Sequence, residues 1–223
     1  MNMAEVVLRA VSKTYRRRAQ PVEALRDVCF SVLKGEFAVF LGASGSGKTT
    51  LLNLIASLDR PDTGEIAVFG EEVARLSRTA AARYRNRCIG IVFQSYNLLP
   101  QLTALENVLL PMLPQRRVDR RLALDLLDRV GLAQRVMHHP PELSGGEQQR
   151  TAIARAFAND PAVILADEPT GNLDDQNAEL VIELLQRSCR ERGTTLLMVT
   201  HDRQALRSAD RIFELQAGKL SPH

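Results

Sequence analysis

The stretch Phe37–Thr50, FAVFLGASGSGKTT, runs from five apolar residues into a glycine-rich turn that ends in a lysine and two threonines. The turn fits the pattern G-x-x-x-x-G-K-[ST], in which backbone N–H groups wrap phosphates while the lysine reaches the terminal ones. This candidate phosphate loop consists of Gly42, Ala43, Ser44, Gly45, Ser46, Gly47, Lys48, Thr49 and Thr50.

A helical pattern follows the loop. Apolar residues recur there at 3.6-residue spacing, at Leu51, Leu54, Ile55 and Leu58. A Gly/Ser-rich surface loop is the alternative interpretation. However, a strand before the turn and a helix after it bring backbone amides and the positive end of a helix dipole to one place. The stretch therefore predicts a phosphate site in which the Thr49 hydroxyl can reach Mg²⁺.

A second apolar run, Val163–Glu168 (VILADE), ends in two adjacent carboxylates. This order suits a buried strand that delivers Asp167 toward Mg²⁺ and Glu168 toward a water molecule, as phosphoryl transfer needs. Taken alone, the pair would also suit a polar turn at the end of a strand. In combination with the phosphate loop, it favours nucleotide hydrolysis.

A third segment, Leu143–Arg150 (LSGGEQQR), has the pattern of a helix start. Ser144 and Glu147 stand in the S-x-x-E relation of a capping box. A well-capped helix whose two glycines permit a close approach is one interpretation. The same glycines, Gly145 and Gly146, would also bring bare amides against an anion.

The segment Leu143–Arg150 resembles the signature motif of the ATP-binding cassette (ABC) ATPases. Other segments match that family in order and at similar spacing, and together they cover essentially the whole chain. Gln94 matches the Q-loop glutamine, Asn172 and Asp174 lie in the segment that resembles the D-loop, and His201 matches the switch histidine. Tyr15 stands where the family places an aromatic residue that stacks on adenine. No motif position is substituted.

The resemblance implies a role for each matched residue. Lys48 and the amides of 45–49 would hold the β- and γ-phosphates of ATP, and Thr49 and Gln94 would ligate Mg²⁺, with Asp167 acting through water. Glu168 would polarise the attacking water and His201 would contact the γ-phosphate. The residues implied to be catalytic are Glu168, His201 and Lys48. A lone histidine at a strand end is otherwise a common structural feature.

The resemblance also implies a partner. Ser144, Gly145, Gly146 and Glu147 would meet a nucleotide held by the phosphate loop of a second copy, so one chain cannot complete its own site. The expected active state is a head-to-tail dimer with two ATP molecules between the copies, which hydrolysis releases. Tyr15→Ala is expected to weaken ATP binding and Tyr15→Phe to leave it unchanged. A strand residue packed on its neighbours is the alternative for Tyr15.

Composition limits the class of protein. The 223 residues carry 29 Lys and Arg against 26 Asp and Glu, a net charge of +3 that is too small to indicate nucleic acid as a partner. The three cysteines, Cys29, Cys88 and Cys189, lie far apart and support neither a disulfide framework nor a zinc site. No stretch approaches about 20 uninterrupted apolar residues. These features favour a cytoplasmic protein. The resemblance to ABC ATPases further implies that it is held at the inner face of the cell membrane through a permease partner.

The order of apolar patterns predicts an α/β fold. Apolar runs at 89–93, 163–166 and 195–200 alternate with helical patterns near 176–192 and 203–209, which implies a parallel sheet with helices on both faces. Alternation at 28–32 and 66–68 indicates antiparallel strands. A helical face is expected at Val118, Leu122, Leu126, Leu127 and Val130. With the resemblance, the expected fold is a P-loop NTPase (RecA-like) core at about 1–94 and 159–223, an antiparallel β subdomain and an inserted helical signature subdomain at about 95–158.

The segments Ser95–Val108 and Ala166–Asp174 resemble the ABC branch that serves lipoprotein-releasing, macrolide-exporting and cell-division membrane complexes. We expect residues 95–113 to dock an integral membrane permease, because this segment follows Gln94 and is rich in leucine. Inward packing of those leucines is the alternative. An importer subunit, a soluble ABC ATPase and a module that binds nucleotide without hydrolysis remain the other functions considered.

Overall fold

A computed structural model describes residues 4–16, 20–116 and 118–222. The central sheet has six strands in the order β10-β9-β3-β8-β7-β6. Neighbours run parallel except β10, which is antiparallel to β9. The strands are β3 (Phe37–Leu41), β6 (Ile89–Phe93), β7 (Val163–Asp167), β8 (Thr195–Val199), β9 (Arg211–Gln216) and β10 (Lys219–Pro222). The predicted parallel sheet is confirmed.

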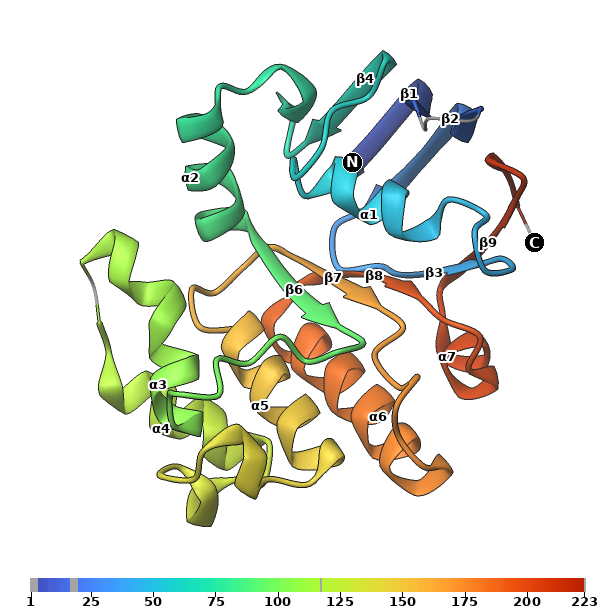
Figure 1. The fold of residues 1–223 in the computed structure, drawn as a ribbon. Helices are drawn as coiled ribbons and strands as arrows, with labels where there is room; N and C mark the ends of the chain where they lie inside the picture. The colour runs from blue at the N-terminus through green and yellow to red at the C-terminus, as the bar shows by residue number, and fades with distance from the viewer. Residues whose placement is uncertain (1–3, 17–19, 117, 223) are drawn as a thin grey trace.

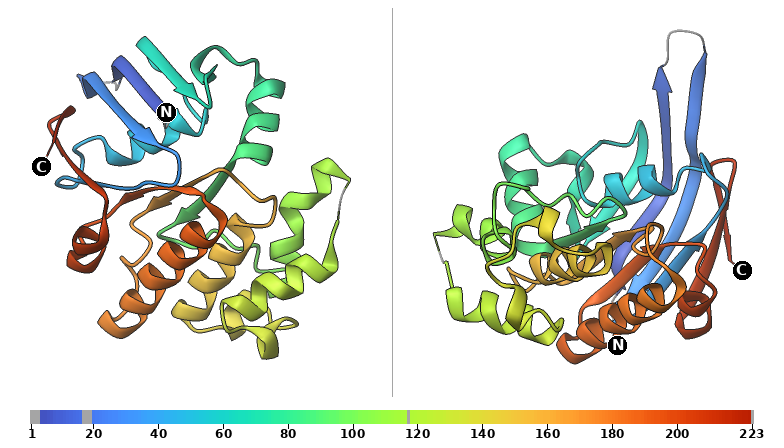
Figure 2. Two further views of the ribbon diagram at one scale, coloured as in Figure 1. Left: turned by 180° about the vertical axis from the view of Figure 1, so that it is seen from behind. Right: turned by 60° about the horizontal axis from the view of Figure 1, so that its bottom comes forward.

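A second sheet is antiparallel and has the order β2-β1-β4-β5. Its strands are β1 (Ala4–Arg16), β2 (Pro21–Leu33), β4 (Thr63–Val68) and β5 (Glu71–Glu72). Figure 2 shows β1 and β2 side by side as a long pair that extends away from the rest of the molecule. The expected antiparallel β subdomain is therefore present.

Helices cover both faces of the central sheet, as Figure 1 shows. Helix α1 (Lys48–Ile55) lies between the two sheets, whereas α5 (Gly145–Ala156) and α6 (Asp175–Arg192) pack on the opposite face. The remaining α-helices are α2 (Arg78–Cys88), α3 (Ala104–Leu109), α4 (Arg120–Arg129) and α7 (Arg203–Ser208), and the 3-10 turns are η1 (Val73–Arg75), η2 (Leu110–Gln115), η3 (Ala133–Arg135) and η4 (Pro140–Glu142).

The central strands β3, β6, β7 and β8 carry almost only apolar residues because both of their faces are buried, and the exceptions Asp167 and Thr195 stand at strand ends. In β7, Ile164 faces the α5–α6 side of the core while Leu165 faces the α1 side. In β3, Val39 likewise faces the α5–α6 side and Phe40 faces the α1 side. Alternate residues of one strand therefore build two separate cores, and the loops at the strand ends are held between them.

Two details differ from the expectations. Helix α4 begins at Arg120 because the Asp119 side chain caps it by accepting a hydrogen bond from Leu122 N–H. Val118 consequently lies before the helix and is 51% exposed, whereas Leu126, Leu127 and Val130 are buried as predicted. Leu58, expected on the apolar face of the helix that follows the phosphate loop, lies beyond the end of α1 and is 49% exposed.

No sequence pattern predicted α2 or the two C-terminal strands β9 and β10. Helix α2 buries only Ala81 and Tyr84, which is too few apolar residues for a helical periodicity to stand out. Between β6 and β7 the chain forms α3, η2, α4, η3, η4 and α5. The division of the chain into a core and a helical subdomain at 95–158 stays a prediction.

Candidate active site

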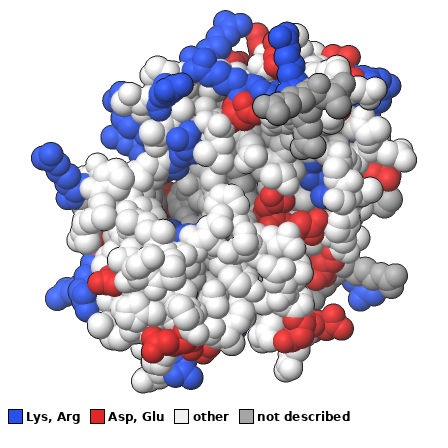
Figure 3. All heavy atoms as spheres, in the orientation of Figure 1, with Lys and Arg blue, Asp and Glu red and all other residues white. Residues whose placement is uncertain are grey.

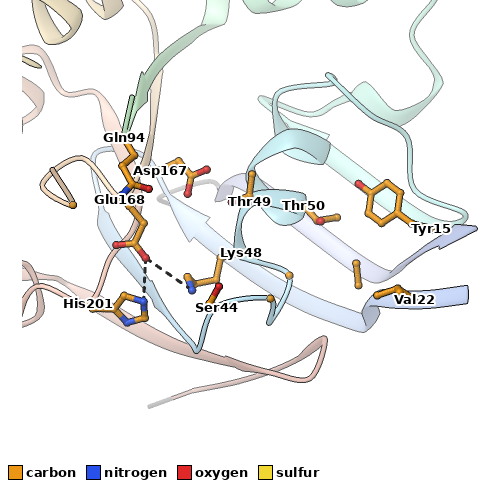
Figure 4. A pocket seen from close by; sticks show the side chains of 14 residues that line it. Tyr15, Val22, Ser44, Lys48, Thr49, Thr50, Gln94, Asp167, Glu168 and His201 are labelled. Carbon is orange, nitrogen blue, oxygen red and sulfur yellow. Dashed lines mark ion pairs between the residues drawn. The ribbon is translucent and has the colours of Figure 1, made fainter. Parts of the chain in front are cut away.

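A cavity of about 700 Å³ lies at the edge of the central sheet where the carboxyl ends of its parallel strands meet. Figure 4 shows side chains from distant parts of the chain that surround it. The lining residues are Tyr15, Val22, Ala24, Ser44, Gly45, Gly47, Lys48, Thr49, Thr50, Gln94, Asp167, Glu168, Gly171 and His201. Five parts of the chain that the sequence marked separately are therefore brought to one place.

The candidate phosphate loop leads from β3 directly into α1. Gly47 caps the helix with a φ of 108°, and a Cβ atom at this position would collide with the carbonyl oxygen of Ala24. Only glycine meets both conditions without strain. The loop thus presents the N-terminus of α1, where backbone N–H groups have no partner within the helix, to the cavity.

Lys48 extends along the loop toward the cavity. Its Nζ donates hydrogen bonds to the carbonyl oxygens of Gly42 at 2.6 Å and Ala43 at 3.0 Å. The same atom lies 3.9 Å from Glu168 Oε1, and only 8% of the side chain is exposed. A shielded ammonium group beside a helix N-terminus is suited to the charge of a polyphosphate.

Glu168 is the centre of the charged part of the cavity. Its Oε1 lies 3.1 Å from His201 Nε2, and its backbone N–H donates to Val199 O at 2.9 Å despite a left-handed φ of 46°. Burial raises the pKa of Glu168, and the nearby Asp167 acts in the same direction, while His201 and Lys48 oppose the rise. Figure 4 shows Glu168 pointing between Lys48 and His201. A carboxylate with a raised pKa can accept a hydrogen bond from water at neutral pH.

The oxygen atoms at the other side of the cavity fit a hard divalent cation. Thr49, Gln94 and Asp167 line it and offer a hydroxyl, an amide carbonyl and a carboxylate. These are the ligands that Mg²⁺ prefers in proteins, usually together with phosphate oxygens and water. No group of three or more His, Cys, Asp or Glu side chains that could hold a metal occurs among the described residues. Thr49, Gln94 and Asp167 could hold Mg²⁺ together with phosphate oxygens.

The segment after Glu168 contacts the candidate Q-loop. Asn172 Nδ2 donates to the carbonyl oxygen of Gln94 at 2.9 Å. Gly171 lies close to the Gln94 side chain, and a Cβ atom there would lie 2.6 Å from Gln94 Nε2, so a larger residue would displace the glutamine amide. Asp174 instead caps α6 by accepting from Asn177 N–H at 2.8 Å. Asn172 and Asp174 are both exposed.

The Tyr15 ring lies at the far end of the cavity, beside Val22 of the neighbouring strand. Its hydroxyl donates a hydrogen bond to Asp59 Oδ2 at 2.8 Å. Burial and this bond raise the pKa of Tyr15, and a hydrogen bond from Thr50 opposes the rise. The hydroxyl therefore helps to hold the ring in place. Because Tyr15→Phe would remove this hydrogen bond, we now expect it to weaken ATP binding rather than leave it unchanged.

The signature segment lies outside this cavity. Ser144 and Glu147 form the predicted capping box, with 2.8 Å from Ser144 N to Glu147 Oε2 and 3.3 Å from Glu147 N to Ser144 Oγ. Both glycines are closely approached: a Cβ atom would lie 3.0 Å from Tyr96 Oη at Gly145 and 2.7 Å from Asn177 Oδ1 at Gly146. The chain does not bring its own signature residues to its own phosphate loop.

Sequence reasoning missed three residues of the lining, Val22, Ala24 and Gly171. Val22 could have been found only from the register of the β1–β2 pair, in which it lies opposite Tyr15. Among the described residues, no helix has the length and apolar character that a membrane crossing needs.

Comparisons with known proteins place this architecture in a family. The ABC transporter family model matches residues 25–171. An uncharacterized ABC transporter ATP-binding protein of Thermotoga maritima is 51% identical over 214 residues, which cover 94% of this chain and 91% of that protein. The lipoprotein-releasing system ATP-binding protein LolD of Xanthomonas euvesicatoria pv. vesicatoria is 46% identical over 222 residues, which cover 97% of this chain and 91% of LolD.

A solved structure agrees with the sequence matches. The dimeric ATP-binding cassette MJ0796, in a post-hydrolysis state bound to ADP and Pi, superposes with a TM-score of 0.90 at 40% identity, covering 97% of this chain and 98% of that chain. The fold, the segments that meet at the cavity and the extent of these matches lead to one conclusion. The chain belongs to the ABC transporter family, as an ATP-binding protein and ABC ATPase.

Proposed function

We propose that this chain is the ATP-hydrolysing subunit of a transporter in which two copies close around two ATP molecules and drive a membrane partner, in lipoprotein release or export. The observation that carries the proposal is the position of Glu168, 3.1 Å from His201 and 3.9 Å from Lys48 at the end of β7. The similarity to LolD supports the lipoprotein-release branch.

The proposed chemistry distributes roles among the lining residues. Lys48 and the loop amides bind the β- and γ-phosphates and offset their charge. Mg²⁺, held by Thr49, Gln94 and Asp167, would supply neutralisation of charge on the phosphate oxygens. Glu168 orients the attacking water and accepts its hydrogen bond, and His201 contacts the γ-phosphate. Shielding of Lys48 and Glu168 from solvent strengthens each of these interactions.

Dimerisation is proposed because the signature residues cannot act within one chain. Ser144 is exposed at the N-terminus of α5, where the helix dipole and free amides suit an anion held by another molecule. The relative MJ0796 is dimeric in its nucleotide-bound structure. We infer that Ser144, Gly145 and Gly146 of each copy complete the site of the other.

A membrane permease is proposed to dock beside residues 95–113, so that the chain works in the cytoplasm at the inner face of the cell membrane. A groove of about 420 Å³ borders this segment and separates it from α2. Its lining includes Leu58, Arg85, Phe93, Asn97, Pro111 and Arg155. Figure 3 shows a hollow in this region, with basic side chains gathered over α2. Leu105 and Val108 of the segment are buried, so only its exposed residues, such as Leu99 and Leu113, can serve a partner.

Glu168→Gln tests the hydrolytic role. The variant should bind ATP, lose most phosphate release and accumulate as a dimer, because hydrolysis is what reopens the interface. Lys48→Ala should fail earlier, at nucleotide binding, since the buried ammonium would be gone. Phosphate release at the normal rate by Glu168→Gln, with unchanged dimerisation, would contradict the assignment. Recovery of the unaltered chain from solubilised membranes without any integral membrane protein would favour a soluble ABC ATPase.

A further inference from the structure

Two charged side chains hold Tyr15 in place and have no part in the function proposed above. The Tyr15 hydroxyl donates to Asp59 Oδ2 at 2.8 Å, and Lys13 Nζ lies 5.1 Å from the centre of the Tyr15 ring. Lys13 and Asp59 form an ion pair with 2.9 Å between Nζ and Oδ1. Only 11% of the Lys13 side chain and 32% of the Asp59 side chain are exposed. We call Lys13, Tyr15 and Asp59 the Tyr15 clamp.

Both carboxylate oxygens of Asp59 are engaged. Besides Lys13, Oδ1 accepts a hydrogen bond from Arg60 N–H at 2.7 Å, while Lys13 also donates to the carbonyl oxygen of Arg60 at 2.6 Å. Burial alone would raise the pKa of Asp59, but the bonds from Lys13, Arg60 and Tyr15 outweigh it and bring the pKa below its ordinary value. Asp59 is therefore a fixed anion at neutral pH.

The clamp is connected to the phosphate loop by a single short helix. Helix α1 starts at Lys48 and ends at Ile55, and Asp59 follows in the turn that leads to β4. Eight helical residues span about 12 Å. The turn therefore fixes the Tyr15 ring at a set distance from the place where the phosphates are proposed to bind.

The two faces of the Tyr15 ring have different surroundings. The ammonium of Lys13 lies over the ring as a cation–π contact, and Lys13 is not one of the described residues that line the cavity. Tyr15 itself lines the cavity together with Val22 and Ala24. One face is thus covered within the protein, and the ring can offer its other face to a flat ligand in the cavity.

We propose that Asp59 and Lys13 are positioning residues for the nucleotide base: they fix the Tyr15 ring so that a purine stacks on it while the phosphates occupy the loop before α1. The inference rests on the function proposed above and adds residues that act on the base alone. A ring already held in place loses no rotational freedom when the base binds, so the contact gives more net affinity. A purely structural ion pair between β1 and the turn would not distinguish one ligand from another.

The test compares two ligands that share phosphates and differ in the base. The dissociation constants of ATP and of inorganic tripolyphosphate are measured by calorimetry for the full chain and its variants. Tyr15→Phe, Lys13→Met and Asp59→Asn should each raise the Kd for ATP by up to about tenfold, which lies toward the lower end of the range for base–aromatic stacking because the ring itself is kept. The Kd for tripolyphosphate should stay unchanged, which also shows that each variant is folded.

Asp62→Asn is the matched control, because Asp62 lies in the same turn and accepts from the backbone N–H of Thr14 at 2.6 Å instead of contacting the ring. It should leave both constants unchanged. The double variant Tyr15→Phe with Asp59→Asn should lose less binding free energy for ATP than the sum of the losses in the two single variants, because both changes remove the same hydrogen bond.

Two results would overturn the inference. One is an unchanged Kd for ATP in Asp59→Asn and Lys13→Met, and the other is an equal rise for both ligands, which would mean that the clamp acts through the fold. Failure of the proposed function looks different: the unaltered chain would then bind neither ligand, or Glu168→Gln would hydrolyse ATP normally.

Discussion

Arg155 of α5 donates from Nη2 to the carbonyl oxygen of Tyr96 at 2.7 Å. Its other terminal nitrogen donates to the carbonyl oxygen of Asn97 at 2.5 Å. Tyr96 and Asn97 both have left-handed φ values, 59° and 50°. One guanidinium therefore holds two consecutive strained residues just after Gln94, and it does so from the same helix that begins with the signature segment. The contact links the segment that follows the candidate Q-loop residue Gln94 to the surface proposed for the second copy.

We predict that Arg155→Lys weakens this link without removing the nucleotide site. A single ammonium group cannot reproduce the two directed bonds of the guanidinium. Hydrogen bonds to charged groups contribute about 1.5–3 kcal/mol each, so urea unfolding should show a loss of stability of about 2 kcal/mol. ATPase activity should fall several-fold while the Kd for ATP stays within twofold. Arg129→Lys is the control, because Arg129 is 54% exposed and its ion pairs contribute little. Full activity in Arg155→Lys would show that the link has no part in turnover.

We predict that the turnover number falls on the acid side at a pH above 4.5. Burial raises the pKa of Glu168 above its ordinary value of 4.5, and the proposed role requires the ionised carboxylate. As the pH falls through the raised pKa, Glu168 takes up a proton and can no longer accept a hydrogen bond from water. The measurement is kcat at saturating ATP between about pH 4 and 8. An acid limb at or below 4.5 would argue against Glu168 as the group that titrates.

We predict that Glu5→Gln changes the pH dependence of stability. The Glu5 side chain is 3% exposed, Oε2 accepts from Thr195 Oγ1 at 2.9 Å, and Oε1 has no hydrogen-bond partner among the described residues. Burial raises the pKa of Glu5, opposed by Thr195 and Lys34. The pKa of Glu5 is therefore higher in the folded state than in the unfolded state. Its contribution to stability is fully present below the unfolded-state pKa, and it is lost as the pH rises through the folded-state pKa.

The free energy of unfolding of Glu5→Gln, measured in urea, should therefore increase relative to that of the unaltered chain as the pH rises above the ordinary Glu pKa of 4.5. Glu65→Gln is the control, because Glu65 is 53% exposed where it pairs with Arg9. Parallel stability curves for Glu5→Gln and the unaltered chain would contradict the prediction.

We predict that charge on the exposed leucines of the proposed docking segment blocks assembly. Leu99 is 44% exposed and Leu113 is 55% exposed, so Leu99→Glu and Leu113→Glu should leave the core intact and make an apolar partner surface unfavourable. The variants should no longer co-purify with an integral membrane protein from solubilised membranes, although they still bind ATP. Leu180→Glu, on α6 at 50% exposure, should co-purify normally. Unchanged yields for the first two variants would place the docking site elsewhere.

Sequence alone determined the features that depend on neighbouring residues. The strand, glycine turn and helix of 37–55 follow from periodicity and from a glycine that no other residue can replace. The capping box of Ser144 and Glu147 is set by hydrogen bonds within four residues. The strand Val163–Asp167 was recognisable because its first four residues, buried on both faces of the sheet, form a continuous apolar run. The family resemblance supplied the roles of the matched residues, and those roles stay predictions.

The tertiary structure decided which distant residues act together. The bond from Tyr15 to Asp59 joins residues 44 positions apart, and Arg155 reaches back 59 positions to Tyr96. Helix α2 and the strands β9 and β10 are positioned by contacts with the central sheet. Their own sequences showed too weak a periodicity to predict these elements. Local patterns fix which element forms because they depend on short-range hydrogen bonds and side-chain period. Strand order, register and packing depend on long-range contacts, and they alone set the distances of the site.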